Sequence, residues 1–227
     1  QLNLAAALAK QGEIDQAIHH FKMVLRSDPN RAEAHNGLGA LLIKNGKIEK
    51  AISHFREALR IKPNYIPARN NLKKALSIQK LFQEKSASIQ EALKNRPNDP
   101  LLHYEMGNLY LAKGELNKAI SEYQKALALQ PRFPQALNNL ALVYAKNKEY
   151  AKALSEFHKM LDHWPDNAET YYNIACMYSR LNRVDESIEW LKKAIDKGYT
   201  KWKNIKTDSD LENIRDSFAY RELIKDH

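Results

Sequence analysis

Prolines recur at one fixed spacing, and this spacing constrains the fold more than any other feature of the chain. Pro29, Pro63, Pro97, Pro131 and Pro165 are each 34 residues apart. Between them, apolar residues follow the spacing of two amphipathic helices, and no stretch alternates long enough to predict a strand. A proline ends one helix and permits the next to begin, because it lacks the amide proton that a helix interior needs. The chain of 227 residues is therefore predicted to be all-α, built of repeated helical hairpins.

Equivalent positions in successive copies carry residues of the same kind. Each helix of a hairpin combines a small residue with a large apolar one. The first-helix residues are Leu4, Leu38, Leu72, Met106, Leu140 and Ile174, followed by Ala5, Gly39, Lys73, Gly107, Ala141 and Ala175. The second-helix residues are Ala17, Ala51, Lys85, Ala119, Ala153 and Ser187, with Phe21, Phe55, Ile89, Tyr123, Phe157 and Leu191. Small residues let two backbones approach closely, and the large neighbour fills the space beside the contact.

The turns inside the hairpins follow the same period. Gly12, Gly46 and Gly114 fall between the two helices of a copy, where glycine adopts a positive φ most easily. Asn147 and Asn182 lie at or beside the same position, and asparagine tolerates that conformation next best. A single hairpin cannot bury its apolar face alone, so neighbouring hairpins are expected to stack.

With this period and pattern, the chain resembles the tetratricopeptide repeat family over residues 1 to about 200. The resemblance implies a right-handed α-solenoid of tandem hairpins, a superhelix whose concave face binds other chains. We expect units 1 and 2 in residues 1–65, with the first unit cut short at its start, and units 4–6 in residues 100–201. The short first unit, and a first residue that is Gln1 rather than Met, predict a fragment or a processed product.

Residues 66–99 depart from the pattern. Lys73 and Lys85 occupy both close-contact positions, and the expected turn at residues 77–81 contains no Gly, Asn or Pro. Two ammonium groups cannot share that gap without swinging out to water. Two structures remain open: a degenerate hairpin, which we favour, or one connecting helix of roughly 28 residues and about 42 Å. Either one divides the array, and this stretch would allow self-association.

The period ends after Lys197, and residues 202–227 are predicted to form a C-terminal cap. Asp208 or Ser209 can begin one short helix, and Asp216 or Ser217 can begin a second. The apolar edge of the last hairpin is expected to be covered by Trp202, Ile205, Leu211, Ile214 and Phe218.

The closing part of the chain carries a second resemblance. Residues 171–199 and 207–215 are similar to the soluble C-terminal arrays of polytopic, glycosyltransferase-like membrane proteins of the O-mannosyltransferase-related class. That resemblance implies a bacterial soluble domain, cytoplasmic or periplasmic, that meets a membrane only through a parent protein. No catalytic portion of such an enzyme is present, so none of its activity is assigned to these residues. No stretch approaches the roughly 20 apolar residues that a membrane-spanning helix needs.

In the family that the chain resembles, the first helix of each hairpin lines the concave surface. Four of the six residues just before the large first-helix residues are asparagine. This is similar to the asparagine ladder of the O-GlcNAc transferase repeats, where side-chain amides bond the backbone of an extended peptide. A line of cations follows on the same face. The residues predicted to bind a peptide are Asn3, Asn71, Asn139 and Asn173, with Asn108, Lys10, Lys44, Lys74, Lys146 and Arg180.

Two features qualify this groove. Gly37 and Glu105 interrupt the asparagine ladder, and the asparagines have a purely structural alternative, which is to bond within their own hairpins or to water. The cations favour an acidic ligand because they can pair with carboxylates. The full residue set of the family's carboxylate clamp for chaperone tails is not found, so recognition of such a tail is not predicted.

The net charge of +9 supplies the alternative function. Residues 1–65 and 66–99 each carry +4, so the basic character lies in the N-terminal portion. Such a surface could bind nucleic acid or another polyanion. Nucleic-acid binding is not favoured, because the aromatic residues fall mostly at packing positions rather than along a basic stripe.

No constellation of residues predicts catalysis or a metal site. There is no Walker loop, nucleophile elbow or dinucleotide fingerprint. His19 and His20 are adjacent and point to different faces of a helix. Cys176 is the only cysteine and is interpreted as a packing residue, which leaves the redox compartment open. We therefore predict a non-catalytic scaffold that binds a protein or peptide, with no cofactor, no metal and no small-molecule substrate.

Overall fold

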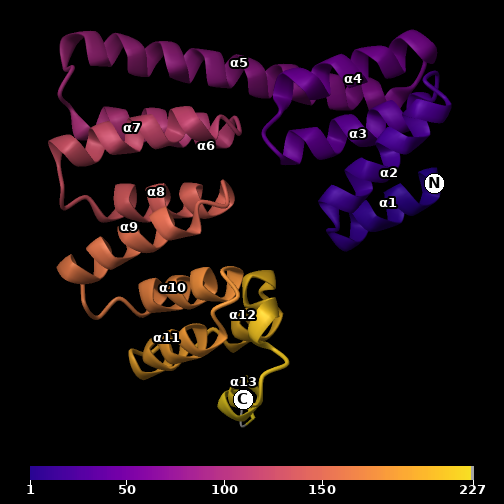
Figure 1. Ribbon diagram of the computed structural model, residues 1–227. Helices are drawn as coiled ribbons and strands as arrows, with labels where there is room; N and C mark the ends of the chain where they lie inside the picture. Colours follow the sequence, from indigo (N-terminus) through magenta and orange to yellow (C-terminus); the bar gives the residue numbers. More distant parts are fainter. Residues whose placement is uncertain (226–227) are drawn as a thin grey trace. The chain divides into compact units, whose positions relative to one another are not determined.

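The computed structural model describes residues 1–225, and the part of the chain that it describes contains helices and no strand. The prediction of an all-α solenoid is confirmed. The helices, in chain order, are α1 Leu2–Gln11, α2 Ile14–Ser27, α3 Ala32–Lys44, α4 Ile48–Ile61, α5 Ile66–Asn95, α6 Pro100–Ala112, α7 Leu116–Leu129, α8 Pro134–Lys146, α9 Tyr150–His163, α10 Ala168–Arg180, α11 Val184–Asp196, α12 Trp202–Thr207, the 3₁₀ helix η1 Ser209–Ile214 and α13 Phe218–Leu223. Figure 1 shows their order along the chain.

The chain forms two compact units. The first contains residues 1–97 with residues 108–115, and the second contains residues 98–107 with residues 116–227. In the first unit, α1 packs on α2 and α3 packs on α4, while α5 lies against α4. In the second unit, α8 packs on α9 and α10 packs on α11. Each unit is thus a stack of helical hairpins with a core of its own.

Each hairpin is held by contacts between small and large side chains, as the pattern predicts. Phe55, Tyr123 and Phe157 are 0–1 % exposed. A Cβ atom built on Gly39 would lie 2.6 Å from the Phe55 ring, and one on Gly107 would lie 2.6 Å from the Tyr123 ring. These glycines therefore leave room for the aromatic ring of the facing helix, a fit that close packing in protein interiors makes necessary.

A serine fills the small-residue position of the last hairpin. Ser187 is fully buried, and its hydroxyl donates a hydrogen bond to the Ala175 carbonyl at 2.7 Å. The small side chain keeps α10 and α11 close together, and the hydrogen bond compensates for burying its polar group.

The turns of the hairpins adopt left-handed backbone conformations at the predicted place, with one difference. Gly46 and Gly114 have φ of 71°. In the second unit the same position is held by Lys148, with φ of 63°, and by Asn182, with φ of 59°. Asn147 comes one residue before the left-handed position and ends α8 with φ of −82°. A lysine therefore stands where a β-carbon makes the left-handed conformation costly.

The proline-containing connections are also tied down by a repeated contact. Six residues after the proline, a side chain of the next helix bonds the proline carbonyl. His35 contacts the Pro29 oxygen, Arg69 donates to the Pro63 oxygen and Tyr171 donates to the Pro165 oxygen, each at 3.0 Å. Three different residue types serve one purpose, because each places a hydrogen-bond donor at the same height of the helix.

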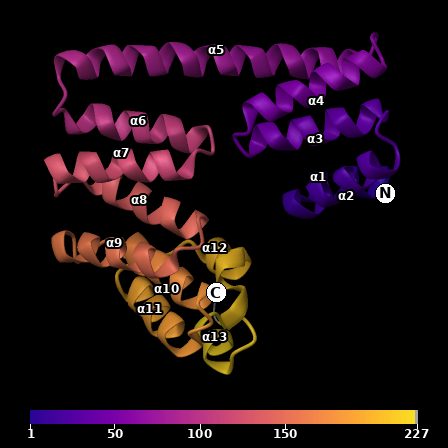
Figure 2. The same ribbon diagram turned by 45° about the horizontal axis from the view of Figure 1, so that its top comes forward.

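Residues 66–95 form one uninterrupted helix, α5, as Figures 1 and 2 show. The degenerate hairpin that we favoured from the sequence is therefore wrong, and the connecting helix is present. The physical reason is local: no glycine, asparagine or proline interrupts the backbone where the turn was expected. The buried side chains of α5 are Ala68, Ala75 and Ile89.

The two lysines at the close-contact positions behave as predicted. Lys73 and Lys85 are exposed, whereas Ala119 and Ala153 at regular positions are fully buried. Both side chains lie on the exposed side of α5, so their ammonium groups can reach water.

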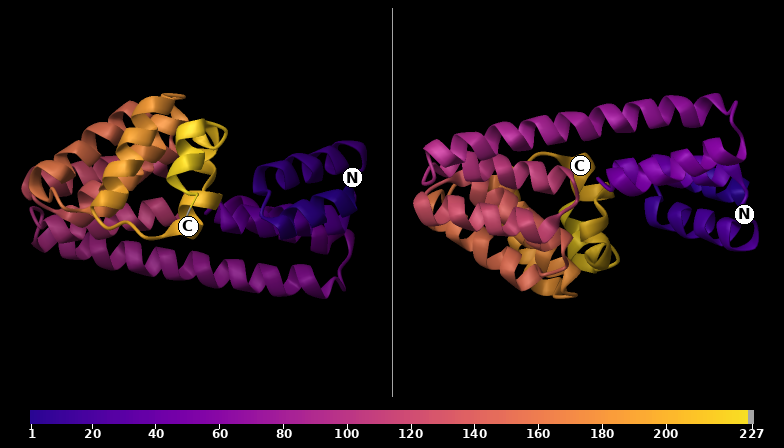
Figure 3. Two further views of the ribbon diagram at one scale, coloured as in Figure 1. Left: turned by 90° about the horizontal axis from the view of Figure 1, so that it is seen from below. Right: turned by 90° about the horizontal axis from the view of Figure 1, so that it is seen from above.

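The C-terminal segment covers the last hairpin, with one exception to the expected residues. Figure 3 shows α12 to α13 beside α10 and α11. The side chains of Ile205, Leu211 and Ile214 are fully buried, but Phe218 is 79 % exposed, so its predicted role in the cap is wrong. Phe218 is the first residue of α13, and there its side chain points away from the hairpin.

The predicted caps of this segment are present. The Asp208 carboxylate accepts from the Asp210 amide at 2.9 Å at the start of η1. The Ser217 hydroxyl accepts from the Tyr220 amide at 3.2 Å at the start of α13. The additional helix α12 was not predicted.

The contact between Gly39 and Phe55 can be tested by overpacking. We expect Gly39→Ala to lower the free energy of unfolding by about 1–3 kcal/mol, because the added methyl group would overlap the ring. Combining it with Phe55→Leu should cost less than the sum of the two single changes, since the smaller side chain makes room. Urea denaturation of the four proteins measures this coupling, and strictly additive effects would contradict the contact.

The continuity of α5 can be tested at Leu81, which is 60 % exposed near its middle. Leu81→Gly should be less stable than Leu81→Ala by about 1 kcal/mol, because glycine disfavours a helix interior. The comparison of the two variants removes the effect of losing the leucine side chain. If residues 77–81 formed a turn, the glycine variant would be as stable as the alanine variant or more so.

Candidate functional site

A cavity of about 430 Å³ opens on the second unit. It is lined by the ends of α8 and α10, by the turn between α8 and α9, and by the start of the C-terminal cap. The lining residues are Leu142, Ala145, Lys146, Lys148, Tyr150, Asn173, Cys176, Met177, Arg180, Asp208 and Asp210. We refer to it as the α8–α10 pocket.

Three residues predicted from the sequence meet in this pocket. Lys146 is the last residue of α8, and Asn173 and Arg180 lie on α10. Lys146 and Arg180 are 34 residues apart and hold the same place in successive hairpins. Stacking of the hairpins therefore brings together, around one pocket, side chains that the repeat period relates.

Arg180 is held in place by its neighbours. Its Nε donates to the Tyr150 hydroxyl at 3.3 Å, and its guanidinium lies 5.9 Å from the centroid of that ring. The same Nε is 3.7 Å from the Asp210 carboxylate. The hydrogen bond to Tyr150 and the nearby acids raise the pKa of Arg180. The guanidinium is thus a fixed positive charge on the wall of the pocket.

Two aspartates of the cap, Asp208 and Asp210, also line the pocket. Asp208 accepts from the Tyr172 hydroxyl at 2.8 Å as well as from the Asp210 amide. The Asp210 carboxylate forms a long ion pair with Arg180, 3.7 Å from its Nε. Burial, and then the charge of Asp208, raise the pKa of the Asp210 carboxyl, while Arg180 acts in the opposite direction. The pocket therefore carries charges of both signs.

Cys176 lines the pocket as a buried thiol. Its side chain is 3 % exposed, and burial followed by the charges of Asp208 and Asp210 raises the pKa of the thiol well above its ordinary value. A neutral thiol attacks poorly, because the thiolate is the reactive form. The interpretation of this cysteine as a packing residue agrees with its burial.

Asn139 does not line the α8–α10 pocket. Its amide donates to the Tyr104 hydroxyl at 3.4 Å and to the Tyr123 hydroxyl at 3.5 Å. Burial raises the pKa of Tyr123 to about 12, so the phenol stays protonated at neutral pH. This asparagine therefore links α8 to helices α6 and α7 of the preceding hairpin, which differs from the bond within its own hairpin that the sequence offered as an alternative.

The remaining predicted residues belong to the first unit. Asn3, Lys10, Lys44 and Lys74 are exposed. Asn71 is half-buried, and its amide donates to the Asn36 side chain at 2.9 Å. Asn108 is also half-buried and lies on α6.

Among the lining residues that the sequence reasoning missed are one lysine, one tyrosine and two aspartates. Lys148 and Tyr150 lie just past the end of α8, and Asp208 and Asp210 lie beyond the last repeat. The lysine could have been found, because it stands 34 residues after Gly114 in a place that favours glycine. The aspartates could not, because only the path of the cap brings them to the pocket.

The described residues contain no group of three or more His, Cys, Asp or Glu side chains that could hold a metal ion. His35 and His54 contact each other at 2.9 Å between their Nδ1 atoms, and no third such side chain joins them among residues 1–225. None of the helices described in residues 1–225 is both long enough and apolar enough to cross a membrane.

The raised pKa of Asp210 predicts a pH-dependent stability. An acid whose folded pKa is raised contributes stability below its unfolded pKa of about 3.9, and that contribution is lost as the pH rises through the folded pKa. Asp210→Asn should therefore raise the melting temperature at pH 7, and the gain should shrink as the pH falls towards about 4. Asp216→Asn, at a fully exposed carboxylate, is the matched control. An equal gain at all pH values would contradict the assignment.

Three solved structures to which the chain is similar are distant from it in sequence. A crystal structure of MamA is 23 % identical over 88 % of this chain and 96 % of that chain, with a TM-score of 0.44. YrrB, described as a TPR protein with an unusual peptide-binding site, is 20 % identical over 80 % of this chain and 93 % of that chain, with a TM-score of 0.49. A chain of the APC/C hetero-tetramer Cut9-Hcn1 is 20 % identical over 96 % of this chain and 42 % of that chain, also with a TM-score of 0.49.

No curated protein matches the chain. The resemblance to a membrane glycosyltransferase-like parent therefore receives no support. The descriptions "Tetratricopeptide repeat" and "TPR repeat" do match, the first over residues 2–66, 88–121 and 132–197 and the second over residues 107–148. Residues 2–66 and 88–197 of this chain are built of tetratricopeptide repeats.

Proposed function

We propose that the chain is a non-catalytic scaffold that binds a segment of another protein, or a peptide, on the faces of its first helices. The observation that carries the proposal is the meeting of Lys146, Asn173 and Arg180 around one open pocket in the second unit. Two of these side chains come from equivalent places in successive hairpins. A site made in this way suits an extended ligand that passes from one hairpin to the next.

The chemistry of the three side chains fits a peptide. The Asn173 amide offers both hydrogen-bond donors and an acceptor, so it can bond a peptide unit without reading its side chain. Lys146 and Arg180 can pair with carboxylates, and an extended chain presents a new residue every 3.3 to 3.6 Å. Backbone contacts would supply general affinity, and the charged groups would supply selectivity.

The first unit supplies further groups to the proposal. Asn3, Lys10, Lys44 and Lys74 are exposed there and available to a ligand. Asn71 would have to exchange its bond to Asn36 for one to a peptide. We also propose that Asn108 contributes to ligand binding. Residues 66–99 are proposed as a surface for self-association.

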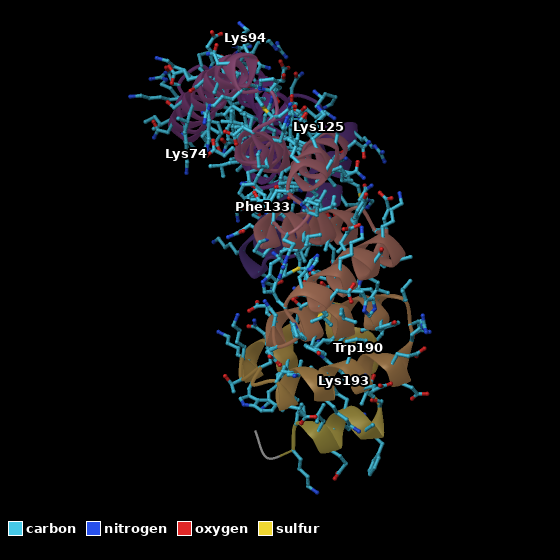
Figure 4. The ribbon with its side chains drawn as sticks, turned by 90° about the vertical axis from the view of Figure 1, so that its left-hand side faces the viewer. Lys74, Lys94, Lys125, Phe133, Trp190 and Lys193 are labelled. Atoms are coloured by element: carbon cyan, nitrogen blue, oxygen red, sulfur yellow. The ribbon has the colours of Figure 1, made fainter. Side chains whose placement is uncertain are left out.

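A polyanion is the second candidate ligand. Two features of the second unit disfavour binding of a nucleic acid there. Asp208 and Asp210 would repel a phosphate that came close to them in the α8–α10 pocket. Aromatic rings elsewhere in this unit pack on each other: Trp190 lies 5.2 Å from the His158 ring, and the Lys193 ammonium lies 4.6 Å from the Trp190 ring (Figure 4). Ring faces occupied in this way are not open to stacking by bases.

The proposal can be tested with peptides selected from a random phage-displayed library on the immobilised chain. Asn173→Ala should weaken binding of the enriched peptides by about 1 kcal/mol, roughly fivefold in Kd, because one hydrogen bond is lost. Fluorescence polarisation of labelled peptides measures the change.

The matched control is Asn117→Ala, which removes an exposed asparagine from α7, a second helix of its hairpin. Affinity should be unchanged in this variant. Peptides that bind Asn173→Ala as tightly as the unaltered chain would show that the ligand lies elsewhere.

A further inference from the structure

We propose that the α8–α10 pocket selects peptide segments that carry charges of both signs. A ligand carboxylate would lie against Lys146 and Lys148, and a ligand ammonium or guanidinium would lie against Asp210. The inference rests on the proposed function and changes one expectation from the sequence, because the line of cations alone favours a purely acidic ligand.

The two lysines of the pocket lining are available to a ligand. Lys146 and Lys148 line the pocket, and neither forms an ion pair with any residue between 1 and 225. Their neighbours are otherwise engaged: Glu149 pairs with Lys152 and accepts a hydrogen bond from Asn147. Two ammonium groups therefore face the cavity without an internal carboxylate to neutralise them.

The backbone at Lys148 is an independent observation. The equivalent turn residues are Gly12, Gly46, Gly114 and Asn182, which are the residue types that a left-handed conformation favours. A lysine at φ of 63° is costlier than either. A strained position at the edge of a pocket indicates a functional role for its side chain, and here the side chain is a cation on the pocket wall.

Of the two carboxylates in the pocket lining, Asp208 has a structural role and Asp210 is available to a ligand. Asp208 begins η1 and bonds the Tyr172 hydroxyl, so its oxygens are used within the protein. Asp210 approaches Arg180 only at 3.7 Å, and its side chain is 45 % exposed. The same arginine Nε also donates a hydrogen bond to the Tyr150 hydroxyl. Asp210 is thus a partly buried carboxylate, and Arg180, the cation near it, also bonds Tyr150.

Charge complementarity then decides which ligand fits. A peptide with only carboxylates would gain from Lys146 and Lys148 but would bring like charge towards Asp210. A peptide with only cations would be attracted by Asp210 but repelled by Lys146 and Lys148. A segment with one acidic and one basic residue can pair with the lysines and with Asp210 at the same time. The cavity of about 430 Å³ has room for more than one side chain.

Four synthetic peptide sets test the inference on the full chain. Each has a neutral Gly/Ser background, with one Glu and one Lys at varied separation, with Glu alone, with Lys alone, or with neither. We expect the best two-charge spacing to bind roughly three- to tenfold more tightly than either single-charge set, as expected for partly exposed ion pairs. Raising the salt concentration should narrow this difference.

Variants of Lys148 and Asp210 test which lining residue binds which charge of the ligand. Lys148→Gly should raise the melting temperature by relieving the left-handed strain, yet weaken only the sets that contain Glu. Asn182→Gly makes the same backbone change outside the pocket, so it should raise the melting temperature and leave all preferences unchanged. Asp210→Asn should weaken only the sets that contain Lys. Folding of every variant is checked by circular dichroism.

Two outcomes would overturn the inference and leave the proposed function standing. In the first, all four sets bind alike and Asn173→Ala weakens all of them. In the second, peptides with Glu alone bind best and Asp210→Asn strengthens them, which would make the cap an internal competitor of acidic ligands. The proposed function itself fails if Asn173→Ala leaves the affinity of every bound set unchanged.

Discussion

The close approach of two helices within each hairpin is the contact on which the structure depends. It requires a small residue on one helix, so that a large ring of the other can enter. Gly39 with Phe55 and Gly107 with Tyr123 show how tight this fit is, since a single added methyl group would overlap the ring. Because this contact recurs, equivalent places of the first helix are presented to solvent in successive copies.

Residues 66–95 show what happens when that contact is missing. Lys73 and Lys85 replace the small residues, and no turn-forming residue separates the two halves. Without the gain from close packing, nothing offsets the cost of breaking the helical backbone, so the helix continues. The lysines then lie in water, where their charges carry little cost.

The α8–α10 pocket combines regular and irregular parts of the chain. Lys146, Asn173 and Arg180 come from the repeat and hold predictable places. Lys148 departs from the repeat by putting a lysine in a turn that favours glycine. Asp208 and Asp210 come from the cap, which follows no period. The repeats therefore place Lys146, Asn173 and Arg180 in the lining, and Asp208 and Asp210 give this pocket its second sign of charge.

The sequence by itself determined the helical hairpins, their turns and the residues of their cores, because a 34-residue period repeats each packing position and each backbone requirement. It also located Lys146, Asn173 and Arg180 on related faces. It could not decide between a hairpin and one helix at residues 66–99, since both satisfy the same apolar spacing. Only the tertiary structure showed that Asn139 bonds tyrosines and that Asp208 and Asp210 meet the basic line. These contacts join residues far apart in the chain, and their partners are set by how the cap and the hairpins pack rather than by any local pattern.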